Sequence, residues 1–332
     1  MTEFVLNLES GVSMNYYIGI DLGGTNIAVG VVDENYKIVG RAKRKTVVTD
    51  NPIRIIDDMA AAAQEAVLDA GLKLADIKRC GVGSPGFADT VNGILYCAFN
   101  LNIDKLNVKE LMEERLNLPT LLANDANAAA LGEMLAGAGK GSDNFVIITL
   151  GTGVGGGVIM NGKMLVGSNF AGGELGHSLL VYNGEKCACG RKGCWETYAS
   201  ATALIRQTKL KMQEYPDSIM WQLTGNNIDN VNGRTAFDAM REGDAAAKEV
   251  VSQYIEYVAA GVTNMINIFQ PQILTIGGGI SKEGDTLIKP VSEYVSKNAF
   301  SSGACEATKI NVAQLGNDAG IIGAAFLHTL NY

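Results

Sequence analysis

The sequence predicts an α/β protein of two lobes, each built on a sheet that begins with a glycine-turn hairpin. Three observations favour this fold. The 332 residues are enough for about two domains of ~150 residues. Strand-like and helix-like segments alternate through the first half of the chain. Residues 17–32 are also similar to residues 145–160, with Leu22-Gly23 aligned on Leu150-Gly151, which indicates a pseudo-duplication.

The composition excludes several classes of protein. The chain is 47% hydrophobic and 19% charged, which is typical of a globular protein and not of a disordered one. Its net charge of −8 argues against a nucleic-acid-binding face. No apolar stretch reaches the ~18 residues that a membrane span needs. Residues 1–13 lack the features of a secretory signal and are predicted to be an extension of little consequence, so we expect a cytoplasmic protein with neither nucleic-acid nor membrane partners.

The first half of the chain predicts a hairpin followed by alternating elements. A strand over 16–20 runs into Asp21-Leu22-Gly23-Gly24-Thr25-Asn26, and a second strand follows over 27–32. Because this glycine turn joins two strands, neither a Walker A loop nor a Rossmann fingerprint is present. The later patterns predict a helix over 53–70, a strand over 79–82, a helix over 108–116 and a strand over 120–122.

The second half predicts a longer lobe. A helix is expected over 243–269, a strand over 273–276 that leads into Gly277-Gly278-Gly279, and a final helix over 319–330. We predict a smaller N-terminal lobe of residues 1–122 and a larger C-terminal lobe of residues 123–318. The C-terminal helical segment 319–332 is expected to pack back on the first lobe.

The glycine turns predict a nucleotide site. The chain has 40 glycines, about 12% against an average near 7%, and many lie in these turns. Without a Cβ, the backbone N–H groups of such a turn can converge on an anion. Two facing turns would hold a triphosphate, with Thr25, Asn26 and Thr152 as side-chain donors. Asp21 would bind Mg²⁺, which prefers carboxylate, water and phosphate oxygens.

Asn124 and Asp125 lie between a short strand and an alanine-rich run, at the expected N-terminus of a helix. Residues of this kind usually cap helices by accepting hydrogen bonds from free amides. Asp125 would alternatively accept the proton of a substrate hydroxyl during phosphoryl transfer. This segment alone favours the cap.

One histidine and three cysteines predict a zinc site. His177 is followed by Cys187, Cys189 and Cys194, in a C-x-C-x4-C pattern with glycines that turn the chain back. Such a closed set of four ligands is typical of structural zinc. This loop would also hold Glu174 and Glu196. With Asn100, Asn124 and Asp125 these carboxylates would suit a polyhydroxylated ligand.

Seven segments together resemble the ROK family (repressors, open reading frames and kinases), and within it the bacterial ATP-dependent glucokinases. They occur in the family's order along nearly the whole chain: DLGGTN at 21–26, GVGSPG at 81–86, ANDANAAALGE at 123–133, LGTGVGGGV at 150–158, GGELGH at 172–177, CACGRKGCWE at 187–196 and TIGGGIS at 275–281.

The resemblance implies a two-lobed, actin-like (ribonuclease H-like) ATPase fold with the substrates in the cleft between the lobes. It implies that Asp125 is the base that takes the proton of the sugar 6-hydroxyl, which changes the interpretation of this residue from cap to base. It also implies ATP, Mg²⁺ and structural Zn²⁺ as cofactors, and a homodimer or homotetramer. The implied contacts are Asn100, Asn124, Glu174, His177 and Glu196 for the sugar, Gly23, Gly24, Thr25, Asn26, Thr152 and Gly153 for the phosphates, Gly278 and Gly279 for adenosine, Asp21 for Mg²⁺, and His177 with the three cysteines for zinc.

Three other functions compete with ATP-dependent 6-phosphorylation of glucose. The acceptor would alternatively be another hexose or an N-acetylhexosamine, such as N-acetylmannosamine, N-acetylglucosamine, fructose, allose or mannose. A sugar-responsive repressor of the same family would carry an N-terminal helix-turn-helix, for which the twenty residues before Asp21 are too few. An inactive sugar-binding protein is disfavoured because the base and both phosphate turns are intact.

Overall fold

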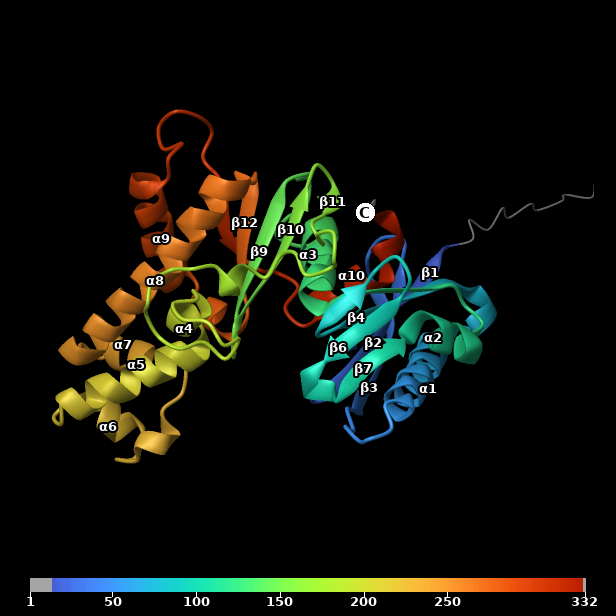
Figure 1. Cartoon of the computed structure of the whole chain (residues 1–332), viewed down its shortest axis with the longest axis horizontal. Helices are drawn as coiled ribbons and strands as arrows, with labels where there is room; N and C mark the ends of the chain where they lie inside the picture. The colour runs from blue at the N-terminus through green and yellow to red at the C-terminus, as the bar shows by residue number, and fades with distance from the viewer. Residues whose placement is uncertain (1–13, 331–332) are drawn as a thin grey trace, which may run out of the picture.

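The computed structural model describes residues 14–330, and the predicted extension of residues 1–13 lies outside this range. Two five-stranded sheets form the centres of the two halves of the molecule (Figure 1). In the first sheet the order is β3 (Ile38–Lys45), β2 (Asn26–Asp33), β1 (Tyr16–Leu22), β4 (Ile77–Ser84) and β8 (Thr120–Asn124). In the second it is β11 (Lys163–Met164), β10 (Val154–Met160), β9 (Phe145–Leu150), β12 (Ile273–Gly277) and β13 (Lys309–Val312).

The two sheets repeat one topology, which confirms the predicted duplication. In each, a glycine turn joins an antiparallel pair, β1 with β2 and β9 with β10. The first strand of each pair then lies parallel to a later strand, β4 or β12. The equivalent turns therefore lie at the same end of their sheets.

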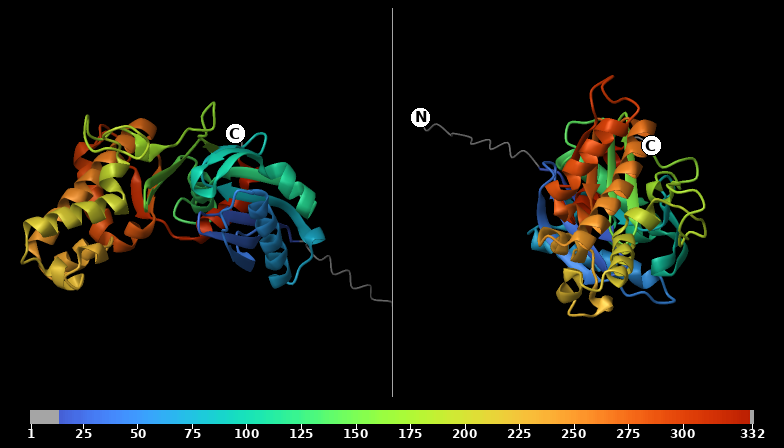
Figure 2. Two further views of the ribbon diagram at one scale, coloured as in Figure 1. Left: turned by 60° about the horizontal axis from the view of Figure 1, so that its bottom comes forward. Right: turned by 90° about the vertical axis from the view of Figure 1, so that its left-hand side faces the viewer.

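Helices cover the sheets in the way that their apolar faces require (Figures 1 and 2). On the first sheet, α1 (Ile53–Asp69) buries a face of isoleucine and alanine side chains, and α2 (Val108–Leu116) packs beside it. The second sheet is flanked by a helical group that shares one core: α4 (Glu196–Ala199), α5 (Ala201–Glu214), α6 (Ile219–Leu223), α7 (Thr235–Arg241), α8 (Ala245–Phe269) and α9 (Asp285–Asn298). No helix among residues 14–330 has the length and apolar character that crossing a membrane requires.

Two small-residue helices cross between the sheets. They are α3 (Asp125–Ala136) and α10 (Asp318–Ala325), and their apolar side chains form a third core with residues of both sheets. The crossing is close because Gly323 faces the carbonyl oxygen of Ala128 and Gly132 faces that of Ala319, so a Cβ at either glycine would overlap an oxygen. The α10 helix also packs on β1 and β4. The predicted boundary between the N-terminal and C-terminal lobes, which lies between residues 122 and 123, stays a prediction.

The predicted final helix over 319–330 is wrong in its second half. The α10 helix ends at Ala325, and Leu327–Thr329 form a separate 3₁₀ turn. Phe326 leaves the helical conformation, and its ring packs against the rings of Tyr17 and Tyr36. Residues 331 and 332 of the predicted segment lie outside the described range.

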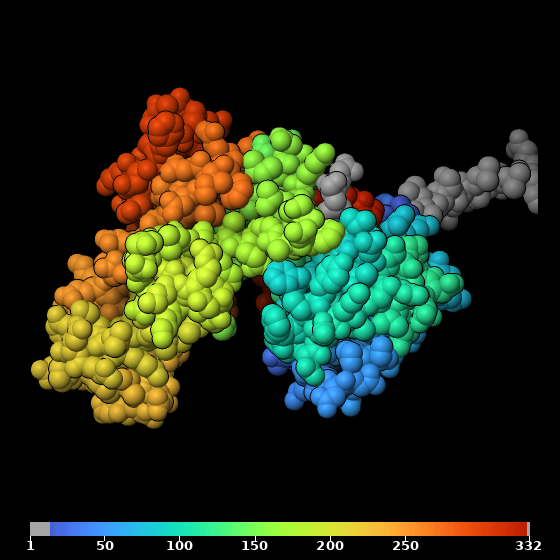
Figure 3. All heavy atoms as spheres, in the orientation of Figure 1, coloured from blue at the N-terminus to red at the C-terminus, as the bar shows by residue number. Residues whose placement is uncertain are grey.

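A small three-stranded sheet completes the first half. Its strands are β5 (Phe87–Asp89), β6 (Ile94–Ala98) and β7 (Ile103–Asn107), and the 3₁₀ turn Phe99–Leu101 between the last two carries Asn100. Figure 3 shows the molecular surface hollowed between the first half of the chain and the residues that follow β10.

Candidate active site

Asp21 and Asp125 lie at the end of the first sheet, on the wall of one cavity. Asp21 pairs with Gly83 across β1 and β4, and Asp125 is the first residue of α3, directly after β8. The cavity has a volume of about 620 Å³ and is also lined by the turn Gly277–Gly279. The structure thus brings the predicted magnesium ligand, the predicted base and the predicted adenosine turn together.

Both carboxyl groups hold a proton more tightly than usual. Burial, and then the charge of Asp125, raise the pKa of Asp21 from 3.8 to about 6. Burial also raises the pKa of Asp125, and the hydrogen bond that the Ala126 amide donates to its Oδ1 (2.8 Å) opposes the rise. Two neighbouring, partly desolvated carboxylates are a fitting environment for a hard divalent cation.

Replacing Asp21 with asparagine is expected to stabilise the protein in the absence of ligands. The raised pKa means that the folded state disfavours the ionised carboxylate. This cost is absent below pH 3.8 and complete above pH 6, where it is about 3 kcal/mol. Thermal unfolding of Asp21→Asn should therefore show a gain over the unmodified protein at pH 8 and almost none at pH 4.

Asp104→Asn, at an exposed position of β7, is the control for this substitution. An equal change in the two variants, or a gain for Asp21→Asn that does not depend on pH, would contradict the assignment.

Asn124, and not Asp125, caps the α3 helix. Its Oδ1 accepts hydrogen bonds from the amides of Ala126 (2.9 Å) and Asn127 (3.3 Å), and its Nδ2 donates to the carbonyl oxygen of Gly86 (3.2 Å). Of the two sequence interpretations, the cap belongs to Asn124. Asp125 is then left on the cavity wall as the first helical residue.

The two predicted phosphate turns have similar internal hydrogen bonds. The Gly23 amide donates to the carbonyl oxygen of Asn26 (2.9 Å), and the Gly151 amide donates to that of Gly153 (3.0 Å). Within residues 14–330, the amides of Gly24, Thr25 and Thr152 donate to no protein acceptor. These amides, and not that of Gly23, are therefore available to an anion.

Glu196 connects the second turn to the cysteine-rich loop. Its Oε2 accepts a hydrogen bond from the Val154 amide (3.0 Å), and its Oε1 lies 3.8 Å from the Sγ of Cys187. Gly153 provides the space, since a Cβ at this position would overlap Oε2. The carboxylate, the turn and the loop are thus fixed relative to one another.

Replacing Gly153 with alanine is expected to displace Glu196 and to weaken hexose binding by about 10-fold or more, the usual cost of disturbing a hydrogen-bonded charged group. Calorimetric titration with hexose in the absence of nucleotide measures this effect. Gly151→Ala is the matched control, because a Cβ at Gly151 meets nothing within 4 Å. Equal affinities for the two variants would contradict the role of Gly153.

His177, Cys187, Cys189 and Cys194 form the predicted four-ligand cluster. Their ligand atoms all lie within 4.8 Å of one another, with 3.7 Å between His177 Nδ1 and Cys187 Sγ and 3.7 Å between the Sγ atoms of Cys189 and Cys194. In a tetrahedral site with Zn–S bonds of ~2.3 Å, sulfur atoms lie ~3.8 Å apart. The geometry and the donor set therefore fit a structural zinc ion. Because Nδ1 faces the cysteines, Nε2 of His177 is left for another partner.

Besides Asn124 and Asp125 at the start of α3, the predicted sugar contacts fall into two groups. Asn100 is exposed on its 3₁₀ turn, and a Cβ on Gly24 would lie 3.1 Å from its Nδ2. Glu174, His177 and Glu196 belong to the second half of the chain, where the His177 amide donates to the Glu174 carbonyl oxygen (3.1 Å). Among the described residues no hydrogen bond or ion pair joins Asn100 to this second group. A sugar bound in the hollow between the two halves of the molecule would therefore have to contact Asn100 on one side and the group of Glu174, His177 and Glu196 on the other.

Among the other residues that line the carboxylate cavity, four with charged or amide side chains were not predicted as site residues. They are Glu133, Lys282, Gln314 and Asn317. Only Glu133 left a signal in the sequence, as an acidic residue within the alanine-rich run 128–138 and the last residue of the ROK-like segment at 123–133. The other three lie next to strand ends or glycines, after β12 for Lys282 and after β13 for Gln314 and Asn317, and their place in the folded chain depends on distant segments.

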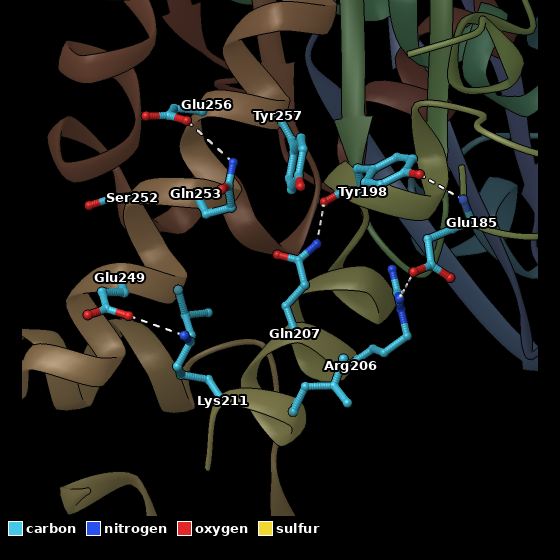
Figure 4. A pocket seen from close by; sticks show the side chains of 12 residues that line it. Glu185, Tyr198, Arg206, Gln207, Lys211, Glu249, Ser252, Gln253, Glu256 and Tyr257 are labelled. Carbon is cyan, nitrogen blue, oxygen red and sulfur yellow. Dashed lines mark hydrogen bonds and ion pairs between the residues drawn. The ribbon is translucent and has the colours of Figure 1, made fainter. Parts of the chain in front are cut away.

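A second hollow of about 540 Å³ lies between α5 and α8, with no glycine turn in its lining (Figure 4). Four of its five charged groups form ion pairs, Arg206 with Glu185 (3.0 Å) and Lys211 with Glu249 (3.1 Å), and Glu256 accepts a hydrogen bond from Gln253 (3.3 Å). Tyr198 also accepts a hydrogen bond from the Glu185 amide (2.7 Å) through its hydroxyl group. Because these charged groups are satisfied within the protein, we assign no ligand to this hollow.

Known proteins are similar to this chain along nearly its whole length. The glucokinase of Halalkalibacterium halodurans is 36% identical over 316 residues, which cover 95% of this chain and 95% of that protein. The crystal structure of a ROK family glucokinase from Streptomyces griseus in complex with glucose and AMPPNP is 34% identical, with a TM-score of 0.78 over 94% of this chain and 99% of that one. The ROK hexokinase from Thermus thermophilus is 31% identical, with a TM-score of 0.78 over 94% and 98%.

These neighbours, with the two repeated sheets, confirm the two-lobed, actin-like ATPase fold. The sequence profile of the ROK family matches residues 17–330, which is almost all of the described chain. The chain therefore belongs to the ROK family.

Proposed function

We propose that this chain, a ROK sugar kinase, transfers the γ-phosphoryl group of ATP to the 6-hydroxyl of a hexose, with glucose as its preferred acceptor. The observation that carries the proposal is the position of Asp125 beside Asp21 in the cavity that the third glycine turn also lines. The similarity to glucokinases, one of them bound to glucose and AMPPNP, supports both substrates.

Asp125 would act as the general base. The hexose O6 attacks the γ-phosphorus, the bond from that phosphorus to the bridging oxygen breaks, and ADP leaves with the bridging oxygen. The 6-hydroxyl proton passes to the Asp125 carboxylate. Burial suits the residue to this role, since a raised pKa makes its carboxylate a stronger base.

The glycine turns would position the nucleotide. The amides of Gly24, Thr25, Thr152 and Gly153 would donate to the phosphate oxygens, with help from the side chains of Thr25 and Asn26. Gly278 and Gly279, which line the same cavity as Asp125, would lie against adenosine. Asp21 would hold Mg²⁺ through water, and the ion would reduce the repulsion between phosphates and carboxylates.

The sugar would be held by six side chains from both halves of the molecule: Asn100, Asn124, Asp125, Glu174, His177 and Glu196. Zinc, when bound by His177 and the three cysteines, supplies structural order to this loop. With Nδ1 on the metal, His177 Nε2 would carry the ring proton and donate a hydrogen bond to a sugar hydroxyl. Glu196 is already anchored to the second phosphate turn, so sugar and phosphate sites would be coupled through it.

A coupled ADP-release assay over a panel of hexoses and N-acetylhexosamines tests the proposal. We expect the highest kcat/KM for glucose. Without Mg²⁺, we expect no ADP release with any sugar. A preference for N-acetylmannosamine, N-acetylglucosamine, fructose, allose or mannose would overturn the choice of acceptor, and no ADP release with any sugar would overturn the kinase. The homodimer or homotetramer that the resemblance implies is a separate prediction, which light scattering tests.

A further inference from the structure

Glu133 is a fully buried carboxylate that the proposed mechanism does not use. Its relative exposure is 0%, although it lies on the same helix as Asp125 and borders the same cavity. Burying a charged group is costly unless hydrogen bonds compensate for the lost water. The partners of Glu133 therefore indicate what the charge does.

Three backbone amides from two segments donate to the Glu133 carboxylate. Oε1 accepts from Leu315 (2.7 Å), and Oε2 accepts from Gln314 (3.1 Å) and Ala138 (2.9 Å). Gly137 allows the contact, because a Cβ at this position would overlap Oε2. The carboxylate thus connects the C-terminal end of α3 to a segment about 180 residues later in the chain.

That segment, residues 313–317, is part of the cavity wall. It joins β13 to α10, and Gln314 and Asn317 line the cavity together with Gly278, Gly279 and Asp125. Since α3 presents Asp125 at its first residue and Glu133 two turns later, a single helix positions both the base and this wall. No sugar contact of the proposed site lies on residues 313–317.

We infer that Glu133 is a positioning residue for the nucleotide, which holds residues 313–317 at the correct distance from the helix that carries Asp125. The inference rests on the proposed function. Glu133 itself touches neither ATP nor hexose. A glutamate suits this position because its two carboxyl oxygens can accept from three converging N–H groups, whereas a glutamine of the same size has a single acceptor oxygen.

Glu133→Gln is the test variant. The glutamine side chain has one acceptor oxygen in place of two. Its NH₂ group would therefore face a backbone N–H group that, in the unmodified protein, donates to the carboxylate. We expect the Kd for ADP and the KM for ATP to rise about 10-fold or more, with the KM for hexose within about 2-fold of the unmodified value. Glu113→Gln is the matched control, because Glu113 Oε1 likewise accepts from a backbone amide, that of Thr120 (2.9 Å), but on α2 and away from the cavity.

Failure of this inference and failure of the proposed function would give different results. A folded Glu133→Gln protein whose ADP affinity is unchanged, or whose KM values for ATP and hexose rise equally, would overturn the inference. If this variant does not fold, hydrogen exchange of the unmodified protein tests the inference instead. Saturating Mg·ADP should slow amide exchange in residues 313–317. Unchanged exchange in this segment would overturn the inference. Because ADP binding is measured without sugar, a failure of the proposed hexose phosphorylation would show separately, as absent turnover in the unmodified protein.

Discussion

Asp125→Asn is expected to lower kcat about 10²- to 10⁴-fold, the range that a general base typically contributes. The asparagine keeps the size of the side chain and the start of α3, since Asn124 provides the cap. It cannot accept the 6-hydroxyl proton. Hexose affinity should change far less than kcat, because five other side chains of the proposed sugar site remain. The coupled assay gives kcat, and calorimetry gives the hexose Kd.

Asp143→Asn, at an exposed position before β9, is the control for this substitution. Retention of kcat within about 5-fold in Asp125→Asn would contradict the base role. A parallel loss of sugar binding would instead indicate that Asp125 acts mainly as a sugar contact.

Cys187→Ser is expected to produce the second large effect, on zinc content and on hexose affinity. The unmodified protein should contain one zinc ion per chain, and the variant should lose it, because a hydroxyl group is a poor replacement for a thiolate ligand. Cys187 lies next to both His177 and Glu196, so the loosened loop should weaken hexose binding about 10- to 100-fold. Elemental analysis and calorimetry measure the two effects.

Cys305→Ser provides the comparison, since Cys305 is an exposed cysteine outside the cluster. It should keep both the zinc and the sugar affinity. The absence of zinc from carefully purified, unmodified protein would disprove the metal assignment.

Features encoded by neighbouring residues could be predicted from the sequence. The two hairpins follow from apolar runs on each side of a glycine turn, and the structure has them over β1–β2 and β9–β10. The four zinc-site residues follow from their spacing, and their side chains do converge. Which of residues 124 and 125 caps α3 needed the structure, because Asn124 Oδ1 accepts from the amides of both Ala126 and Asn127, whereas Asp125 Oδ1 accepts from that of Ala126 alone.

Features that depend on distant contacts could not be predicted. Glu133 is held by amides 181 and 182 residues away, and Glu196 by an amide 42 residues away. The end of α10 at Ala325 depends on the rings of Tyr17 and Tyr36, which receive Phe326. The close crossing of α3 and α10 similarly requires glycines on both helices whose opposed positions appear only in the folded chain.

The central claim is that the chain phosphorylates a hexose on its 6-hydroxyl group. The most direct measurement is to incubate the unmodified protein with Mg·ATP and glucose and to identify the product by phosphorus–proton correlation NMR. We predict a phosphate signal coupled to the two protons on C6, and the loss of this product in Asp125→Asn. A signal coupled to the anomeric proton, or ATP consumed with no sugar phosphate formed, would contradict the claim.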